Sequence, residues 1–191
     1  MRILRASDYR SMPWKNGGGV TTEIAVSPHG AGLDGFDWRV SMARVETGGP
    51  FSVFTGIDRT LSILDGEGMR LAIAGREPVE LTRSSEPLFF PADAATEALL
   101  LAGPITDLNV MTRRGRARHT VRRISLSTSL DLVTDADTTL ILCDEGCVSS
   151  DESPSAGLGA RDTLWLDGVG QAVRLQPQPH AVLFLIAIQN D

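Results

Sequence analysis

The chain has 191 residues, a formal net charge of −6, 42% hydrophobic and 22% charged residues. This composition excludes a disordered chain and indicates one large globular domain or two small ones. The two cysteines are too few for a disulfide framework or a four-thiolate zinc site, and His29, His119 and His180 are too far apart in the sequence for a clustered metal motif.

No apolar run has the length of a signal peptide or of a membrane-spanning helix. The longest, Ala181 to Ile188, suits a buried strand. We therefore expect a cytoplasmic protein without a membrane partner. Cys143 and Cys147 are four residues apart, and we interpret them as buried thiols, with a redox pair as the weaker alternative.

Short runs with the two-residue period of strands fill the chain. In Trp38 to Ala43, Trp38, Val40 and Met42 alternate with Arg39, Ser41 and Ala43. The only helical candidate is a turn over Ser7–Met12, with Ser7 as its N-cap. The further predicted strands cover residues 20–26, 59–64, 69–73, 78–81, 88–90, 96–101, 107–112, 119–126, 138–143, 163–166, 172–175 and 181–188. Many short strands separated by turns predict an all-β sandwich or barrel.

A loose repeat divides this pattern into two similar β-units. Residues 60–71 (TLSILDGEGMRL) and 138–148 (TTLILCDEGCV) both show a strand, an acidic turn with glycine and another strand. The segment 149–159 is expected to be an exposed loop within the second unit. Together with RDTLWLDG at 161–168, this pattern resembles that of the cupins, which are small jelly-roll barrels. Residues 54–59, just before the first of these strands, contain no histidine, so we expect neither a cupin-type metal centre nor another cofactor.

The segment 13–24 (PWKNGGGVTTEI) is the most unusual part of the sequence. Three consecutive glycines expose backbone N–H groups and permit positive φ, and Lys15 beside them adds a charge, so the turn is suited to receiving an anion. It lacks the Gly-Lys-Ser/Thr order of a phosphate-binding loop. The alternative is a structural bend that lets Trp14 close one end of a barrel.

Two predicted strands carry polar residues on one face. Arg39 and Ser41 lie opposite the apolar face of their strand. Asn109, Met111 and Arg113 share a face of another strand, which we interpret as a pocket wall; the alternative is an inward Asn109 whose amide is satisfied by the backbone. Asp58 and Arg59 stand at a strand entry and are candidates for an arginine–carboxylate pair.

A basic cluster spans residues 113–123 (RRGRARHTVRR). It has no interleaved aromatic residues, and the second half of the chain is acidic. We therefore expect these arginines to pair with carboxylates, and we expect no nucleic-acid partner.

The order and spacing of several motifs resemble the HutD/Ves family of bacterial proteins. These motifs are PWKNGGGVTTEI at 13–24, WRVSMA at 38–43, GPFSVFTGIDRTL at 49–61, GEGM at 66–69 and GPITDLNVMTRRG at 103–115. The resemblance implies a bicupin, which has two jelly-roll (double-stranded β-helix) barrels in one chain with few helical turns and without the usual metal ligands. We expect barrels at 1–115 and 116–191, packed as one compact unit, and leave open whether N-terminal strands also complete the second barrel.

The resemblance also implies a link to histidine utilisation, with a regulatory role through binding of an intermediate such as formylglutamate or urocanate. It brings no established catalytic activity. Our main hypothesis is a small carboxylate bound in the first barrel. The candidate residues supply positive charge, hydrogen bonds, apolar walls or carboxylates that orient the arginines: Trp14, Lys15, Asn16, Thr22, Glu23, Arg39, Ser41, Phe54, Asp58, Arg59, Asn109 and Met111.

Two other classes of function stay open at this stage. A metal-independent isomerase or hydrolase on the same scaffold would use Glu23 with Lys15, or Asp58 with a water molecule, although no nucleophile–His–acid arrangement identifies catalytic residues. A module that only binds a protein partner is the third hypothesis. The sequence does not decide the oligomeric state, for which a homodimer is one option.

Overall fold

The computed structural model describes residues 1–14, 17–150 and 153–191, with side-chain burial given outside residues 153–156. It is all-β, as the sequence predicts, and its described helical structure is one 3-10 turn, η1 (Ala6–Asp8). No helix in the described ranges is long and apolar enough to cross a bilayer. The chain divides into an N-terminal unit, Arg10–Arg118, and a C-terminal unit in which Met1–Tyr9 joins His119–Asp191.

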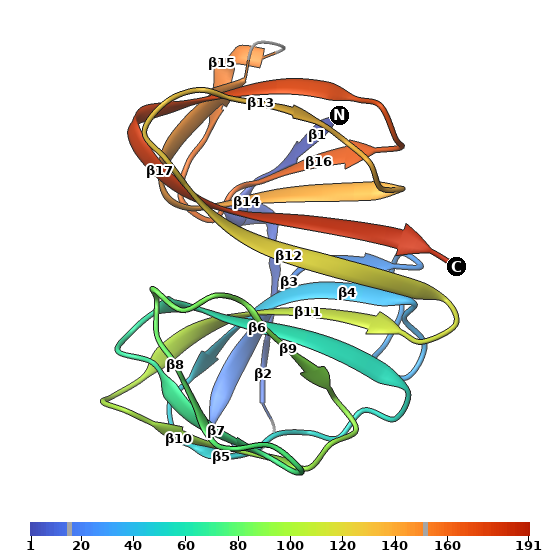
Figure 1. Ribbon diagram of the computed structural model, residues 1–191, viewed down its shortest axis with the longest axis vertical. Helices are drawn as coiled ribbons and strands as arrows, with labels where there is room; N and C mark the ends of the chain where they lie inside the picture. Colours follow the sequence, from blue (N-terminus) through green and yellow to red (C-terminus); the bar gives the residue numbers. More distant parts are fainter. Residues whose placement is uncertain (15–16, 151–152) are drawn as a thin grey trace. The chain divides into compact units, whose positions relative to one another are not determined.

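The strands of both units are labelled in Figure 1. Their bounds are β1 (Arg2–Leu4), β2 (Arg10–Pro13), β3 (Gly19–Ser27), β4 (Trp38–Val45), β5 (Gly49–Pro50), β6 (Ile57–Asp65), β7 (Met69–Ile73), β8 (Val79–Leu81), β9 (Leu88–Pro91), β10 (Thr96–Leu100), β11 (Ile105–Arg113), β12 (Ala117–Leu126), β13 (Leu130–Val133), β14 (Thr138–Ser150), β15 (Ser153–Leu158), β16 (Thr163–Asp167) and β17 (Ala172–Asn190).

Each range expected from the two-residue period overlaps a strand, and most ends agree within two residues. Three expectations were wrong. The strands expected at 172–175 and 181–188 are parts of one strand, β17, and β14 continues well beyond its expected end at Cys143. The segment expected to be a loop at 149–159 contains β15, which pairs with the extended end of β14. Ser7 does not cap a helix, because the 3-10 turn starts after Arg5 and the Ser7 hydroxyl donates to Asp8 Oδ1 instead.

The N-terminal unit has a six-stranded sheet in the order β2-β3-β4-β11-β6-β9 and a four-stranded sheet in the order β5-β10-β7-β8. Figure 1 shows the two sheets facing each other in this unit. Their pairings are antiparallel, and β11 lies between β4 and β6. Since side chains alternate between the faces of a strand, one face of the six-stranded sheet points into the space between the sheets.

Apolar side chains from both sheets fill most of that space. The buried core cluster includes Leu61 and Ile63 of β6, Leu71 of β7, Phe90 of β9 and Ala98 of β10. The opposite face of the six-stranded sheet also carries buried apolar residues, which include Trp38, Val40, Met42, Leu108 and Val110. The charged residues described below are therefore set within a largely apolar interior.

The C-terminal unit is built on one sheet in the order β1-β16-β14-β17-β12, with β13 paired to β17 and β15 paired to β14. β1 joins it by pairing with β16. Leu164 of β16, Ile141 and Cys143 of β14, and Leu175 and Leu183 of β17 belong to its core cluster. The N-terminal segment is also held by Tyr9, whose hydroxyl lies 2.9 Å from the carbonyl oxygen of Arg161.

The structure has its unit boundary at residues 118 and 119, within β12, and returns Met1–Tyr9 to the C-terminal unit, whereas the sequence suggested 1–115 and 116–191. The strand order of each sheet is open rather than closed on itself. The description as two complete jelly-roll barrels therefore stays a prediction.

Candidate functional site

The inward face of the six-stranded sheet brings together most of the polar residues singled out from the sequence. In the strand register, Met111 lies opposite both Arg39 and Arg59, and Asn109 lies opposite Ser41. Glu23 lies opposite Ser41 on the other side of β4. Neighbouring strands therefore place the side chains of these residues side by side.

Arg59 is the central group of this set. Its guanidinium carbon lies 5.2 Å from the ring centre of Phe51, 5.4 Å from that of Phe54 and 5.9 Å from that of Phe90. Arg59 is 5% exposed, and Met111 Sδ accepts a hydrogen bond from its Nη2 at 3.9 Å. Its Nε has no hydrogen-bond partner, and among the described residues no carboxylate lies at ion-pair distance from it. Burial lowers the pKa of Arg59 to about 10.

The second arginine of the face, Arg39, is neutralised by its neighbour. Arg39 Nε donates to Glu23 Oε2 at 2.8 Å, and the side chains are 7% and 20% exposed. A buried pair of this kind is held in place because breaking it leaves one charge uncompensated. Glu23 therefore orients Arg39, while Arg59 lacks such a partner in the described parts of the chain.

Asp107 lies on the same face of β11 as Asn109 and Met111, and it is 1% exposed. The Asn109 amide donates a hydrogen bond to its Oδ1. Burial raises the pKa of Asp107 to about 7, against the opposing attraction of Arg59 and the hydrogen bond from Asn109. Sequence reasoning missed this residue, although its two-residue spacing from Asn109 was a signal that could have found it.

Trp14 and the glycine turn form one wall of the unit. Trp14 Nε1 donates to Thr21 Oγ1 at 2.7 Å, and its ring packs against the core cluster. A Cβ added at Gly19 would lie 3.1 Å from the Trp14 ring and would also collide with the backbone oxygen of Arg44. Glycine at this position therefore lets the ring approach the strand. Lys15 and Asn16, expected to bind the ligand, fall outside the described residues.

Two of the expected site residues point elsewhere. The Thr22 hydroxyl lies 2.9 Å from the Ser11 hydroxyl, on the face of β3 opposite to Glu23. The Asp58 carboxylate accepts from Arg114 Nε at 2.8 Å rather than pairing with Arg59. Each is one residue away from an inward-facing residue, so the alternation of the strand turns it outward.

Arg114 forms hydrogen bonds that hold the loop that carries Phe54. Besides Asp58, it binds both carboxylate oxygens of Asp93, at 2.7 and 3.1 Å. These hydrogen bonds lower the pKa of Asp93 to about 2 and raise that of Arg114. Asp93 also accepts from the backbone N–H of Gly56, whose φ of 71° suits glycine.

A pocket of about 240 Å³ opens beside this loop. Phe54 belongs both to its wall and to the set of rings around Arg59. Arg113 also lines it and is fixed by hydrogen bonds to the backbone oxygens of Phe36 and Asp34, at 2.9 and 3.0 Å. The remaining lining residues are Leu33, Asp34, Val53, Thr55 and Ile57. Phe54 is thus the residue that the pocket lining and the surroundings of the buried guanidinium have in common.

Phe51 and Phe90 are two further residues that sequence reasoning did not assign to the site. Phe90 lies opposite Arg59 in the β6–β9 register, and Phe51 packs from the segment after β5. The two-residue period alone does not say which face of β9 is the inward one. The pairing of β9 with β6, which places Phe90 opposite Arg59, decides it. Nothing in the local sequence distinguished Phe51 from Phe54.

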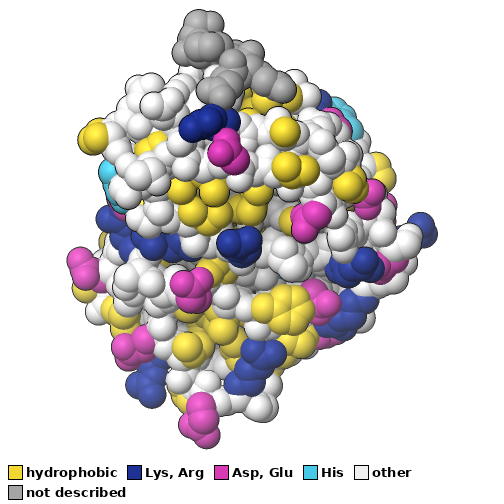
Figure 2. Space-filling model, turned by 45° about the horizontal axis from the view of Figure 1, so that its top comes forward, with side chains coloured by type: hydrophobic (Ala, Val, Ile, Leu, Met, Phe, Trp, Pro, Cys, Tyr) yellow, Lys and Arg dark blue, Asp and Glu magenta, His cyan; other side chains and the backbone are white. Residues whose placement is uncertain are grey.

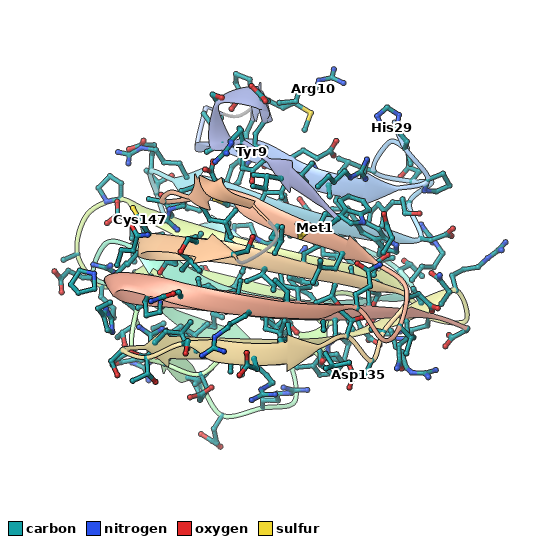
Figure 3. The ribbon with its side chains drawn as sticks, turned by 90° about the horizontal axis from the view of Figure 1, so that it is seen from above. Met1, Tyr9, Arg10, His29, Asp135 and Cys147 are labelled. Carbon is teal, nitrogen blue, oxygen red and sulfur yellow. The ribbon has the colours of Figure 1, made fainter. Side chains whose placement is uncertain are left out.

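The histidines and cysteines do not form a centre within the described ranges, where no group of three or more His, Cys, Asp or Glu side chains could hold a metal ion. His29 projects outward from the loop after β3 (Figure 3), and His180 Nε2 lies 2.9 Å from the Ser125 hydroxyl. Cys143 is buried and Cys147 exposed. Burial raises the pKa of the Cys143 thiol to about 12, so it is inert as a nucleophile near neutral pH.

Two arginines of the basic cluster, Arg113 and Arg114, are held by partners in the N-terminal unit. These partners are backbone oxygens and carboxylates. On the face drawn in Figure 2, Lys and Arg side chains lie among acidic and hydrophobic ones. The carboxylate partners of Arg114, Asp58 and Asp93, come from the first half of the chain rather than from the acidic second half.

Comparison with known proteins relates the chain to one family. The HutD family model matches residues 6–184. An uncharacterised 21.2 kDa protein of Pseudomonas putida, named for its place in the hutC 3′ region, is 36% identical over 183 residues and covers 93% of each chain. Protein Ves of Citrobacter koseri is 37% identical over 119 residues, which are 60% of this chain and 61% of the relative.

Solved structures support the same family assignment. A conserved Pseudomonas aeruginosa protein of unknown function has a TM-score of 0.88 at 36% identity, over 98% of each chain. HutD from Pseudomonas fluorescens has a TM-score of 0.83 at 31% identity, over 100% of this chain and 98% of its own. YhhW from Escherichia coli, with a TM-score of 0.70 at 9% identity over 97% and 96%, shares the cupin-like fold alone. The chain therefore belongs to the HutD family, as the motifs of its first 115 residues predicted.

Proposed function

We propose that this protein binds a small carboxylate, without a metal, at Arg59 in the interior of its N-terminal unit. The observation that carries the proposal is a buried guanidinium whose Nε lacks a partner and that has no carboxylate at ion-pair distance among the described residues. A buried charge without a counter-ion is costly, and an anionic ligand with two oxygens offsets that cost through charge-assisted hydrogen bonds.

The neighbours of Arg59 fit a small organic acid better than an inorganic ion. Phe51, Phe54 and Phe90 provide apolar surface around the guanidinium, while Ser41 and Asn109 supply hydrogen-bonding groups on adjacent strands. Pockets for small metabolites combine apolar walls with a few polar groups in this way. Arg39 is held by Glu23, so its contribution is to the shape and potential of the site.

The ligand would enter through the pocket bounded by Phe54 and Arg113. Phe54 lines this pocket and its ring centre lies 5.4 Å from the Arg59 guanidinium carbon, so displacement of this one side chain would bring a ligand from the pocket to Arg59. The Arg113 guanidinium stands at this entrance and attracts anions toward it.

Calorimetry with formylglutamate, glutamate and urocanate tests the binding. We expect one of the three to bind with a 1:1 stoichiometry, and Arg59→Met to weaken that binding at least about 100-fold. The matched control is Arg70→Met, which removes an exposed arginine from β7 of the same unit and leaves binding intact. The absence of heat with all three compounds at millimolar concentration contradicts the proposal.

The role we infer is regulatory, in histidine utilisation. Its support is membership of the HutD family and the relative from Pseudomonas putida named for the hutC 3′ region. Deletion of the gene is expected to change the expression of histidine-degrading enzymes during growth on histidine. A wild-type copy should restore the normal level, whereas an Arg59→Met copy should not, and restoration by both would sink this role.

We propose no enzymatic activity, because the two carboxylates considered for acid–base chemistry are engaged. Glu23 pairs with Arg39, and Asp58 pairs with Arg114. We also propose that each unit is a cupin-type jelly roll. The repeated strand–turn–strand pattern supports this, and so do the two facing sheets of the N-terminal unit. An experimental structure in which the sheets of a unit do not curl around its core would contradict that assignment.

A further inference from the structure

Asp107 is a buried carboxylate that the binding of an anion at Arg59 does not itself use. It lies on the inward face of β11, opposite Ala43 of β4 and Ile63 of β6, which are both apolar. Within the part of the chain that the structure describes, its carboxylate accepts a hydrogen bond from the Asn109 amide. A carboxylate in such a setting has few groups to stabilise its charge.

Four charged side chains of the described residues face this interior, Glu23, Arg39, Arg59 and Asp107. A fifth, Arg113, lies on the same face at the end of β11, where it lines the pocket and donates to the backbone oxygens of Phe36 and Asp34. Glu23 and Arg39 neutralise each other at 2.8 Å. Arg59 and Asp107 are left as a second, looser balance of charge, since they feel each other's field but form no ion pair within the part of the chain that the structure describes. Without a ligand, the charges of Glu23, Arg39, Arg59 and Asp107 therefore sum to about zero when Arg59 and Asp107 are both ionised.

We propose that binding of a carboxylate at Arg59 is coupled to the uptake of one proton by Asp107. The inference rests on the proposed function, because it needs an anion at Arg59. When the anion arrives, Arg59 becomes its counter-ion, and the charge of Asp107 is left uncompensated in an apolar interior. A proton from solvent bonds to one carboxylate oxygen of Asp107 and restores neutrality, so no other reactant is required.

The direction of the pH dependence follows from this balance. The pKa of Asp107 is already raised to about 7 by burial, and the attraction of Arg59 is the largest influence that lowers it. An anion that neutralises Arg59 removes that attraction and raises this pKa further. Below about pH 7 Asp107 already carries its proton, so affinity is nearly constant. Above that pH each bound anion takes up a proton, and affinity falls by up to tenfold per pH unit.

The test is calorimetry at pH 8 with formylglutamate, whose carboxylates stay ionised throughout, in phosphate and in Tris. These buffers differ in their heat of ionisation, so the difference between the observed enthalpies counts the protons exchanged. We expect the wild type to take up nearly one proton per ligand. Asp107→Asn imitates the neutral acid, and we expect it to take up none and to bind with an affinity independent of pH between 6 and 8.

Asp65→Asn is the matched control, because it removes an exposed carboxylate from β6 and should leave the proton uptake unchanged. The measurement on the wild type does not depend on whether Asp107→Asn folds. Binding with equal enthalpies in both buffers overturns the coupling and leaves the carboxylate site intact. Proton uptake that persists in Asp107→Asn also overturns it. If formylglutamate, glutamate and urocanate all fail to bind, the proposed function falls and the coupling falls with it.

Discussion

The two units differ in whether their buried charged side chains have ion-pair partners. In the C-terminal unit the core cluster is apolar, and the buried carboxylates of Asp144 and Asp162 are paired with Arg161 and with Arg5, the latter at 2.7 Å. In the N-terminal unit, Arg59 lies within the interior with three phenylalanine rings around it and, among the described residues, without an ion-pair partner.

The contrast is instructive because the sequence repeats the same motif in both units. In β14, Ile141 and Cys143 belong to the apolar core cluster of the C-terminal unit. In β6, Leu61 and Ile63 belong to the core cluster of the N-terminal unit, but Arg59, on the same face of that strand, is a buried charge. Both units are built from β-sheets, and the side chains placed on those sheets, rather than the sheets themselves, decide function.

The largest effect is expected from a cavity in the apolar core. Ile141→Ala removes a side chain that is 1% exposed, and it should lower the free energy of unfolding by about 3 kcal/mol. Urea denaturation followed by circular dichroism measures this. Val133→Ala, in the same unit but exposed, is the control with little effect. Formylglutamate binding should survive in the folded fraction. Its loss would mean that the core of the C-terminal unit also determines binding, and that the binding site does not depend on the N-terminal unit alone.

The opposite sign is expected in the N-terminal unit. At pH 6, where Asp107 carries its proton and leaves no uncompensated charge, Arg59→Met replaces a buried charge by an apolar side chain of similar length, which is neutral or stabilising by about 1–3 kcal/mol. The same variant should bind the carboxylate at least about 100-fold more weakly. Denaturation and calorimetry on one preparation measure both. A strongly destabilised variant would indicate that Arg59 is a structural group like Arg5, and would remove the contrast between the units.

The pH dependence of stability offers a third comparison. Asp107 has a folded-state pKa of about 7, above its unfolded value, so its proton favours the folded state at low pH and that stability is lost as pH rises toward 7. Between pH 5 and pH 8 the wild type should lose on the order of 2–3 kcal/mol. Urea denaturation across this range should show a flatter profile for Asp107→Asn. An unchanged profile would place the titrating group elsewhere.

The smallest effect is expected at the exposed ion pairs. Arg114→Met releases Asp58 and Asp93 and should lower the melting temperature by only about 1–3 °C, because solvent screens these charges. Its sharper signature is faster amide exchange at Gly56, whose N–H binds Asp93. Arg5→Met is the counterpart in the other unit. Equal exchange at Gly56 in both variants would show that Arg114 does not hold the Phe54 loop.

Strand periodicity predicted a large part of both fold and site. It placed Arg39 and Ser41 on one face, and Asn109 with Met111 on another, and the register then brought these faces together. The same period shows why Thr22 and Asp58 were wrongly grouped with Glu23 and Arg59, since neighbours in a strand point to opposite faces. Asp107 satisfied the period but was overlooked, because a lone aspartate among apolar residues resembles a turn residue.

The sequence by itself determined the all-β class, the positions of most strands and the family. These follow from local alternation, from glycine-containing turns and from motifs in a fixed order. Only the tertiary structure decided which residues share the interior. The isolation of Arg59, its ring neighbours and the burial of Asp107 depend on pairing between strands that are tens of residues apart. Whether a buried charged side chain has an ion-pair partner, and how far it is removed from water, depend on that long-range packing. No local sequence pattern encodes either property.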